Sequence, residues 1–173
     1  MAISFIGEKA NNMFTCTTHS PEETEGLAEL VGKRIREGTV LCLVGDLGAG
    51  KTLFVKSLAR TLGVEGSVTS PTFNLMHVYD GICPIYHFDL YRLKREEELD
   101  EIGFYEYTEN AQDSEGLVII EWPDKFPSCM PKDYVEVRIV QTGETERALT
   151  FSSVGTYYDK FVKELESFVH LGH

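Results

Sequence analysis

The hydrophobic pattern of the first third of the chain predicts a strand, a helix, a second strand and a second helix. Residues 13–18 have strand character, and a capped helix begins at Ser20 and keeps its apolar side chains on one face until Gly38. An uninterrupted apolar run at 40–44 predicts the next strand, and apolar side chains at helical spacing then continue up to Gly63. This alternation is typical of an α/β domain.

The rest of the chain adds antiparallel pairing to this pattern. Residues 72–79 and 84–90 alternate as two strands around the turn Asp80-Gly81, and a short helix is predicted at 95–102. The apolar run 117–120 predicts a strand buried on both faces. The closing elements are an antiparallel pair and an amphipathic helix, predicted at 134–140, 147–152 and about 157–171. We expect one domain over 13–173, after a loosely ordered leader at 1–12.

The loop after the strand at 40–44 carries a phosphate-binding pattern. Glycines at 45, 48 and 50, followed by Lys51 and Thr52, match G-x-x-x-x-G-K-[ST]. Small residues let backbone N–H groups approach phosphate oxygens, and the N-terminus of the next helix faces the same anion. Lys51 would contact the β- and γ-phosphates, and the Thr52 hydroxyl would bind Mg²⁺. The candidate nucleotide contacts here are Gly45, Asp46, Leu47, Gly48, Ala49, Gly50, Lys51, Thr52 and Leu53.

The strand–loop–helix context favours a nucleotide site over the alternative, a glycine-rich turn without a ligand. The predicted fold is therefore a single P-loop NTPase-type α/β/α domain with a mixed, partly antiparallel central sheet. A Mg²⁺–nucleotide site also needs an acid at the end of a neighbouring strand. Glu121 follows the apolar run 117–120, and Asp89 follows the strand that begins at residue 84. Either acid could contact the ion while the other orients water, or either could form a structural ion pair.

Two further features lie near these acids in sequence. The hydroxyl-rich segment 67–73, which includes Thr72 as a candidate phosphate contact, is either a nucleotide-sensitive switch or an ordinary Ser/Pro turn. Trp122, the only tryptophan, either lies beside the nucleotide or packs in the core. Asp124 is predicted to be exposed, and the five histidines show no triad or metal-binding spacing, so we interpret them as structural or surface residues.

Composition narrows the function further. The net charge is -12, with 16 Lys and Arg against 28 Asp and Glu, which opposes direct binding to RNA or DNA. The four cysteines have no spacing suited to zinc, and Cys42 is predicted to be a buried thiol. No segment reaches the ~18–20 apolar residues of a membrane span. We expect a cytoplasmic protein without a membrane partner.

Four segments taken together closely resemble the TsaE (YjeE) family of bacterial ATPases. They are 45–52, Ser70-Pro71-Thr72-Phe73, His87-Phe88-Asp89-Leu90-Tyr91-Arg92 and Glu121-Trp122-Pro123, and the resemblance covers roughly residues 14–152. It implies an ATP- and Mg²⁺-dependent subunit that works with TsaB and TsaD in the threonylcarbamoylation of adenosine 37 in tRNAs reading ANN codons. This subunit would meet tRNA only through its partners.

The resemblance also implies roles for individual residues. Thr52 and Glu121 match the Mg²⁺ ligands of the family, Asp89 matches an acid needed for activity, and Lys51 completes the expected catalytic set. Trp122 matches a tryptophan beside the nucleotide, and Thr24 lies near the position where the family's N-terminal segment meets adenine. Leu53 stands where many members carry Thr or Ser.

Two other functions remain open at this stage. A small-molecule P-loop kinase would need several arginines over the transferred phosphate, and only Arg92, Arg95, Arg138 and Arg147 follow the predicted P-loop helix. A GTP-dependent switch would need an N-K-x-D motif, which the sequence lacks. For an ATPase we expect in-line attack of water on the γ-phosphate and slow turnover, because no arginine finger is apparent.

Overall fold

The computed structural model describes residues 12–69 and 75–171. A mixed sheet forms its centre. The strands are β1 (Met13–Thr18), β2 (Val40–Val44), β3 (Met76–Asp80), β4 (Pro84–Asp89), β5 (Leu117–Glu121), β6 (Tyr134–Gln141) and β7 (Arg147–Val154). The α-helices are α1 (Pro21–Gly32), α2 (Lys51–Thr61), α3 (Glu97–Glu101), α4 (Phe104–Thr108) and α5 (Asp159–His170), with short 3₁₀ turns η1 (Ala111–Asp113), η2 (Pro123–Lys125) and η3 (Pro127–Cys129).

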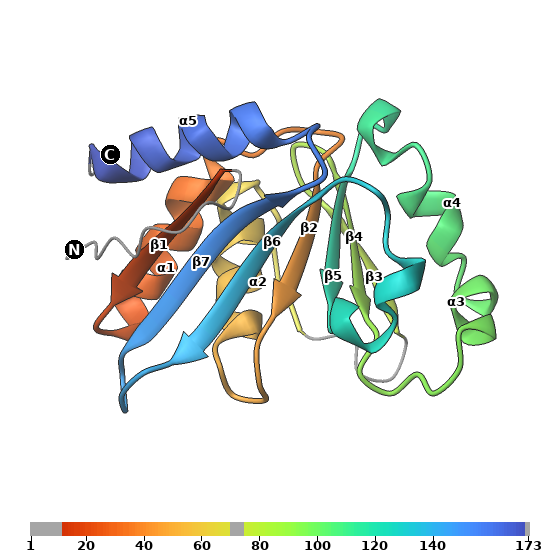
Figure 1. The fold of residues 1–173 in the computed structure, drawn as a ribbon, viewed down its shortest axis with the longest axis horizontal. Helices are drawn as coiled ribbons and strands as arrows, with labels where there is room; N and C mark the ends of the chain where they lie inside the picture. The colour runs from red at the N-terminus through yellow and green to blue at the C-terminus, as the bar shows by residue number, and fades with distance from the viewer. Residues whose placement is uncertain (1–11, 70–74, 172–173) are drawn as a thin grey trace.

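The sheet order is β1-β7-β6-β2-β5-β4-β3 (Figure 1). The inner strands β6, β2, β5 and β4 run parallel, whereas β1, β7 and β3 pair antiparallel with their neighbours. The predicted mixed sheet is therefore confirmed. Because ligand crevices form outside the carboxyl ends of parallel strands, this topology brings the loops after β2, β4 and β5 to one edge of the sheet.

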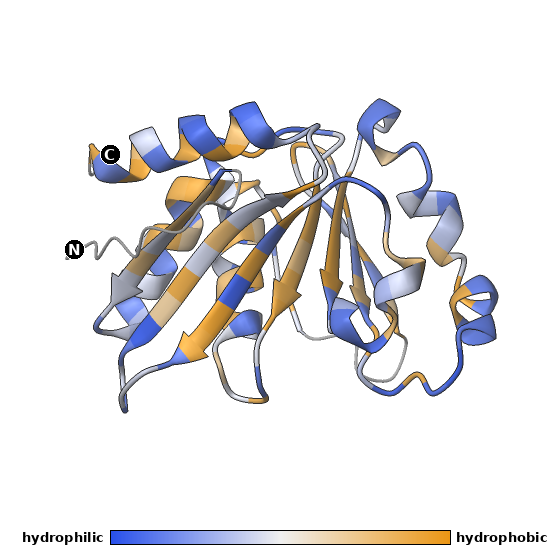
Figure 2. Cartoon of the chain, in the orientation of Figure 1, coloured by the Kyte–Doolittle hydropathy of each residue, from blue (hydrophilic) through white to orange (hydrophobic). Residues whose placement is uncertain are grey.

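Helices cover both faces of the parallel strands, which gives the predicted three-layer arrangement (Figure 1). Along β2, Leu41 and Leu43 pack in one core with α1, α2 and α5, while Val40 and Cys42 pack in a second core with α3 and α4. Every residue of β2 and β5 is buried, and Figure 2 shows these strands as continuous hydrophobic bands. Such strands are stabilised by burial on both faces, which explains their unbroken apolar runs.

Several predicted boundaries need correction. Helix α1 ends at Gly32, not at Gly38. Gly32 lies against α2, where a Cβ atom would be 2.9 Å from the Cβ of Thr61, so the close approach of the two helices favours glycine at this position. Gly38 instead has φ +79° and marks the turn into β2. The helix predicted at 95–102 covers only 97–101, and Gly103, with φ +71°, separates it from α4, which was not predicted.

Other predictions are confirmed within the described residues. Ser20 caps α1 by accepting a hydrogen bond from the Glu23 amide at 3.1 Å, and the β3–β4 pair turns after Asp80. Cys42 is fully buried, and burial raises the pKa of its thiol well above the usual value. Across residues 12–69 and 75–171, no helix is both long and apolar enough to span a bilayer. The leader at 1–11 and the segment 70–74 lie outside the described residues.

Candidate functional site

The P-loop connects β2 to α2 and has the backbone conformation that its glycines allow. Gly48 and Gly50 have φ of +78° and +112°, which residues with side chains rarely adopt. A Cβ atom on Gly45 would lie 2.6 Å from the carbonyl oxygen of Ile139, so the base of the loop packs directly against the β6 backbone. Helix α2 begins at Lys51, and the first backbone N–H groups of a helix have no intrahelical partner. The loop therefore presents free N–H groups beside a helix N-terminus.

Lys51 is largely buried, and its ammonium group lies over the loop. The Nζ atom donates hydrogen bonds to the carbonyl oxygens of Gly45 and, at 3.3 Å, Asp46. It also lies 3.9 Å from the centre of the Trp122 ring, a cation–π contact. Burial lowers the pKa of Lys51, and the carboxylates of Glu121 and Asp89 oppose that shift. Its hydrogen bonds go to neutral carbonyls, and charged phosphate oxygens would bind the ammonium more strongly than these do.

The two predicted acids are neighbours at the carboxyl ends of β4 and β5. Asp89 and Glu121 are paired in register, so their side chains leave the same face of the sheet. Both are buried, with 7% and 2% of their surface exposed, and both line one pocket with Lys51 and Thr52. Asp89 also accepts a hydrogen bond from the Tyr91 amide at 3.0 Å. Within the described ranges, no three His, Cys, Asp or Glu side chains could hold a metal ion by themselves. An ion here would also need oxygens from Thr52 and a nucleotide.

His87 is a site residue that the sequence analysis missed. Its Nε2 atom lies 2.8 Å from Oε2 of Glu121, and the pair is almost completely buried. With an ionised carboxylate, Nε2 carries the proton and donates. The Nδ1 atom is buried and has no hydrogen-bond partner among the described residues. The sequence held one signal: His87 is two residues before Asp89, so both side chains lie on the same face of β4.

We expect His87→Ala to lower the free energy of unfolding by about 1–3 kcal/mol, because the Glu121 carboxylate would stay buried without its donor. Urea denaturation measures this change. His87→Gln keeps an N–H donor and should recover part of the loss, whereas His77→Ala, on the register partner in β3, should cost less. An H87A protein as stable as the parent would show that Glu121 does not depend on this contact.

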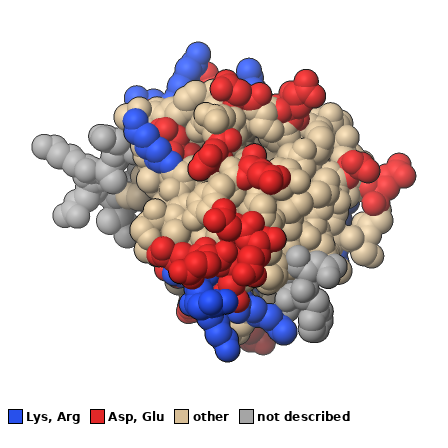
Figure 3. Space-filling view, turned by 90° about the vertical axis from the view of Figure 1, so that its right-hand side faces the viewer, with Lys and Arg blue, Asp and Glu red and all other residues tan. Residues whose placement is uncertain are grey.

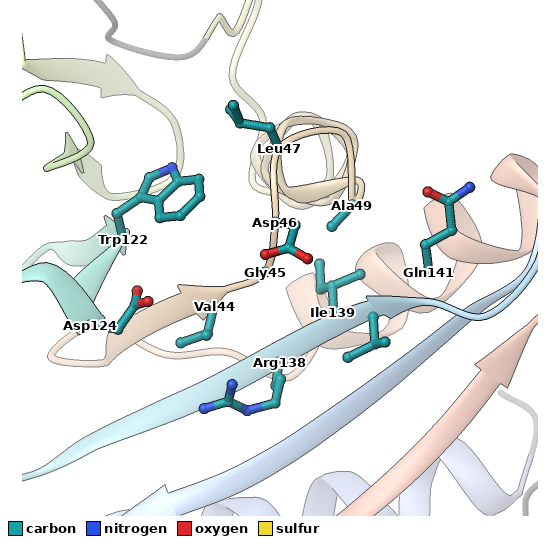
Figure 4. Close-up of a pocket in the computed structure, with 11 residues that line it drawn as sticks. Val44, Gly45, Asp46, Leu47, Ala49, Trp122, Asp124, Arg138, Ile139 and Gln141 are labelled. Carbon is teal, nitrogen blue, oxygen red and sulfur yellow. The ribbon is translucent and has the colours of Figure 1, made fainter.

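Trp122 stands between two hollows beside the P-loop. It has φ +61° and lies directly after β5, and its ring is 4.8 Å from that of Tyr91. One hollow, of about 430 Å³, contains the helix-facing side of the loop with Lys51, Thr52 and both acids. The other, of about 410 Å³, lies toward β6; Figure 4 shows Trp122, Asp46 and Arg138 around it. Trp122 is thus half-buried: it lines both hollows and also packs against the second core.

The remaining candidate residues differ in where they lie. Thr52 is exposed in the pocket of Lys51, as a metal-binding hydroxyl requires. Leu53 lines a different hollow, beside Glu25 and Lys56. Thr24 is buried and bonded to the Thr18 hydroxyl at 2.7 Å, and it lines neither pocket at the P-loop. Thr72 lies outside the described residues. Asp124 is exposed, as predicted.

The four arginines that follow α2 do not form a lid over the described pocket. Arg92 lines it together with Lys51 and Glu121. Arg138 forms an ion pair with Glu136, and Arg147 is bonded to backbone carbonyls. A single pocket-lining arginine is fewer than the several expected of a small-molecule kinase.

Comparison of the sequence with known proteins identifies the family of this chain. The family model described as threonylcarbamoyl adenosine biosynthesis protein TsaE matches residues 18–149. The chain belongs to the TsaE family. A relative of that name from Bacillus subtilis (strain 168) is 39% identical over 149 residues, which cover 86% of this chain and 90% of the relative. One from Treponema pallidum (strain Nichols) is 37% identical over 135 residues, 78% of this chain and 97% of the relative.

A solved structure has the same fold as this chain. The crystal structure of Bacillus subtilis YdiB superposes with a TM-score of 0.74 at 33% identity, covering 92% of this chain and 98% of that one. The resemblance to TsaE and the predicted fold class are therefore confirmed. The part matched by the TsaE family model includes the P-loop, Asp89 and Glu121, whereas α5 follows it in the chain.

Proposed function

We propose that this TsaE-family chain is an ATP-binding, slowly ATP-hydrolysing subunit of the machinery that forms threonylcarbamoyladenosine at position 37 of tRNAs reading ANN codons. One observation carries the ATPase part: the P-loop lysine and hydroxyl and two strand-end acids line one pocket. The family model and the curated relatives, all described by this biosynthesis, support the pathway.

In this proposal each residue of the pocket has a separate role. The loop N–H groups and Lys51 hold the phosphates. Thr52 and Glu121 hold Mg²⁺, because Mg²⁺ prefers oxygen ligands such as their hydroxyl and carboxylate groups. Bound Mg²⁺ neutralises charge on the phosphate oxygens. Asp89 orients the attacking water or supports the ion through a neighbour. His87 holds the Glu121 carboxylate in place by donating to one of its oxygens.

The charge of one face of the chain supports a role that depends on protein partners. Figure 3 shows acidic side chains gathered on the face that carries α3 and α4. The first turn of α3 itself contains Glu97, Glu98 and Asp100. An acidic face opposes contact with phosphate backbones, so we propose that tRNA is reached only through TsaD and TsaB.

The test is association with purified TsaB and TsaD, with and without ATP and Mg²⁺. We expect nucleotide-dependent binding, together with an ATPase rate that the partners increase. A chain that neither binds nucleotide nor associates with the two proteins would overturn the proposal. Phosphorylation of a small metabolite by labelled ATP would instead support the kinase alternative.

A further inference from the structure

We infer that Arg147, at the start of β7, is a positioning residue that fixes the orientation of the Ala49–Gly50 peptide in the P-loop. This inference rests on the proposed nucleotide site. The Arg147 Nε group donates a hydrogen bond of 2.8 Å to the carbonyl oxygen of Ala49, across 98 positions of sequence. Arg147 lies outside the phosphate-binding pattern and cannot be recognised from it.

The geometry of a peptide bond gives this contact its consequence. In a trans peptide the carbonyl oxygen of one residue and the N–H of the next point in opposite directions. The Ala49 side of the loop lines the hollow toward β6, whereas Gly50 lines the pocket of Lys51 and Thr52. By holding the Ala49 oxygen on the β7 side, Arg147 directs the Gly50 N–H away from itself, toward the phosphate pocket.

This peptide needs an outside restraint because its neighbours are permissive. Gly48 and Gly50 both have positive φ, and glycine adopts either sign of φ at little cost. A loop with such residues on both sides of Ala49 can rotate the peptide plane with little steric resistance. A rotated plane would present a carbonyl oxygen to the phosphates in place of an N–H donor, which would repel the anion.

The β6–β7 hairpin holds the guanidinium in place. Arg147 Nη1 donates to the carbonyl oxygen of Glu146 at 2.9 Å and lies near those of Gly143 and Glu144. The Glu146 carboxylate in turn is bonded to Thr142 at 2.8 Å and to His19 at 3.0 Å. These contacts occupy Nε and Nη1, and Arg147 lines neither hollow beside the P-loop, so its role there is structural.

The test compares binding of ADP and of inorganic pyrophosphate, which lacks the nucleoside, to the full chain and its variants. We expect R147A to raise the dissociation constants of both ligands about tenfold. The Gly50 N–H group that Arg147 orients would donate to a phosphate oxygen of any polyphosphate, with or without a nucleoside. R147K should recover only part of the affinity, since an ammonium lacks the planar fork that reaches Ala49 and the hairpin together. Competition against a fluorescent nucleotide measures both ligands.

Controls separate this role from general stability. E146Q weakens the hairpin contacts but leaves the Arg147–Ala49 bond, so it should lower the melting temperature without the tenfold loss of pyrophosphate binding. Equal affinities of R147A and the parent for pyrophosphate would overturn the inference, as would full recovery by R147K. A parent chain that binds neither ligand would instead refute the nucleotide site itself.

Discussion

Replacing Lys51 with alanine is expected to raise the dissociation constant for ATP at least about 100-fold, or ~2.7 kcal/mol. The Lys51 ammonium is largely buried; it donates to the Gly45 and Asp46 carbonyls and lies over the Trp122 ring, and the Glu121 and Asp89 carboxylates also favour its charged form. Phosphate oxygens would replace neutral acceptors with charged ones, and charge-assisted hydrogen bonds are the stronger kind. Isothermal titration with a non-hydrolysable ATP analogue measures the loss directly.

The matched control is Lys56→Ala on the same helix. Lys56 is exposed and lines a different hollow, so its removal changes the net charge equally without reaching the P-loop. We expect K56A to bind ATP like the parent. Comparable losses in the two variants would show that net charge alone governs binding, and unchanged binding by K51A would exclude Lys51 from the phosphate site.

The features that the sequence predicted well are those that local pattern determines. The P-loop has its residues within eight positions, and each glycine meets a backbone requirement that no other residue satisfies easily. Glu121 was found because a carboxylate directly after a buried apolar strand is conspicuous. The order of strands and helices followed from the alternation of hydrophobic spacings.

The features that were missed depend on contacts between distant segments. The His87–Glu121 bond joins residues 34 apart and requires the parallel register of β4 and β5, which no local pattern specifies. Arg147 reaches the P-loop only after β7 has folded beside β6. The close approach of Gly32 to Thr61 of α2 is likewise a contact between two helices, which the spacing within α1 does not reveal.

Replacing Glu121 with glutamine is expected to reduce ATP hydrolysis about 100-fold or more, while nucleotide binding without Mg²⁺ stays unchanged. An amide binds Mg²⁺ more weakly than a carboxylate, because it carries no charge. The structure favours glutamine, since its amide oxygen can still accept the bond from His87, whereas alanine would leave the buried Nε2 atom without an acceptor. Single-turnover hydrolysis at several Mg²⁺ concentrations measures the effect.

Two other acids provide the comparison. Asp124→Asn removes an exposed carboxylate three positions after Glu121 and should leave the Mg²⁺ dependence of hydrolysis as in the parent. Asp89→Asn should slow hydrolysis but keep the Mg²⁺ concentration at half-maximal rate close to that of the parent, because its proposed role is indirect. If D89N instead shifted the Mg²⁺ dependence and E121Q did not, Asp89 would be the direct ligand and the proposed division between the two acids would be reversed.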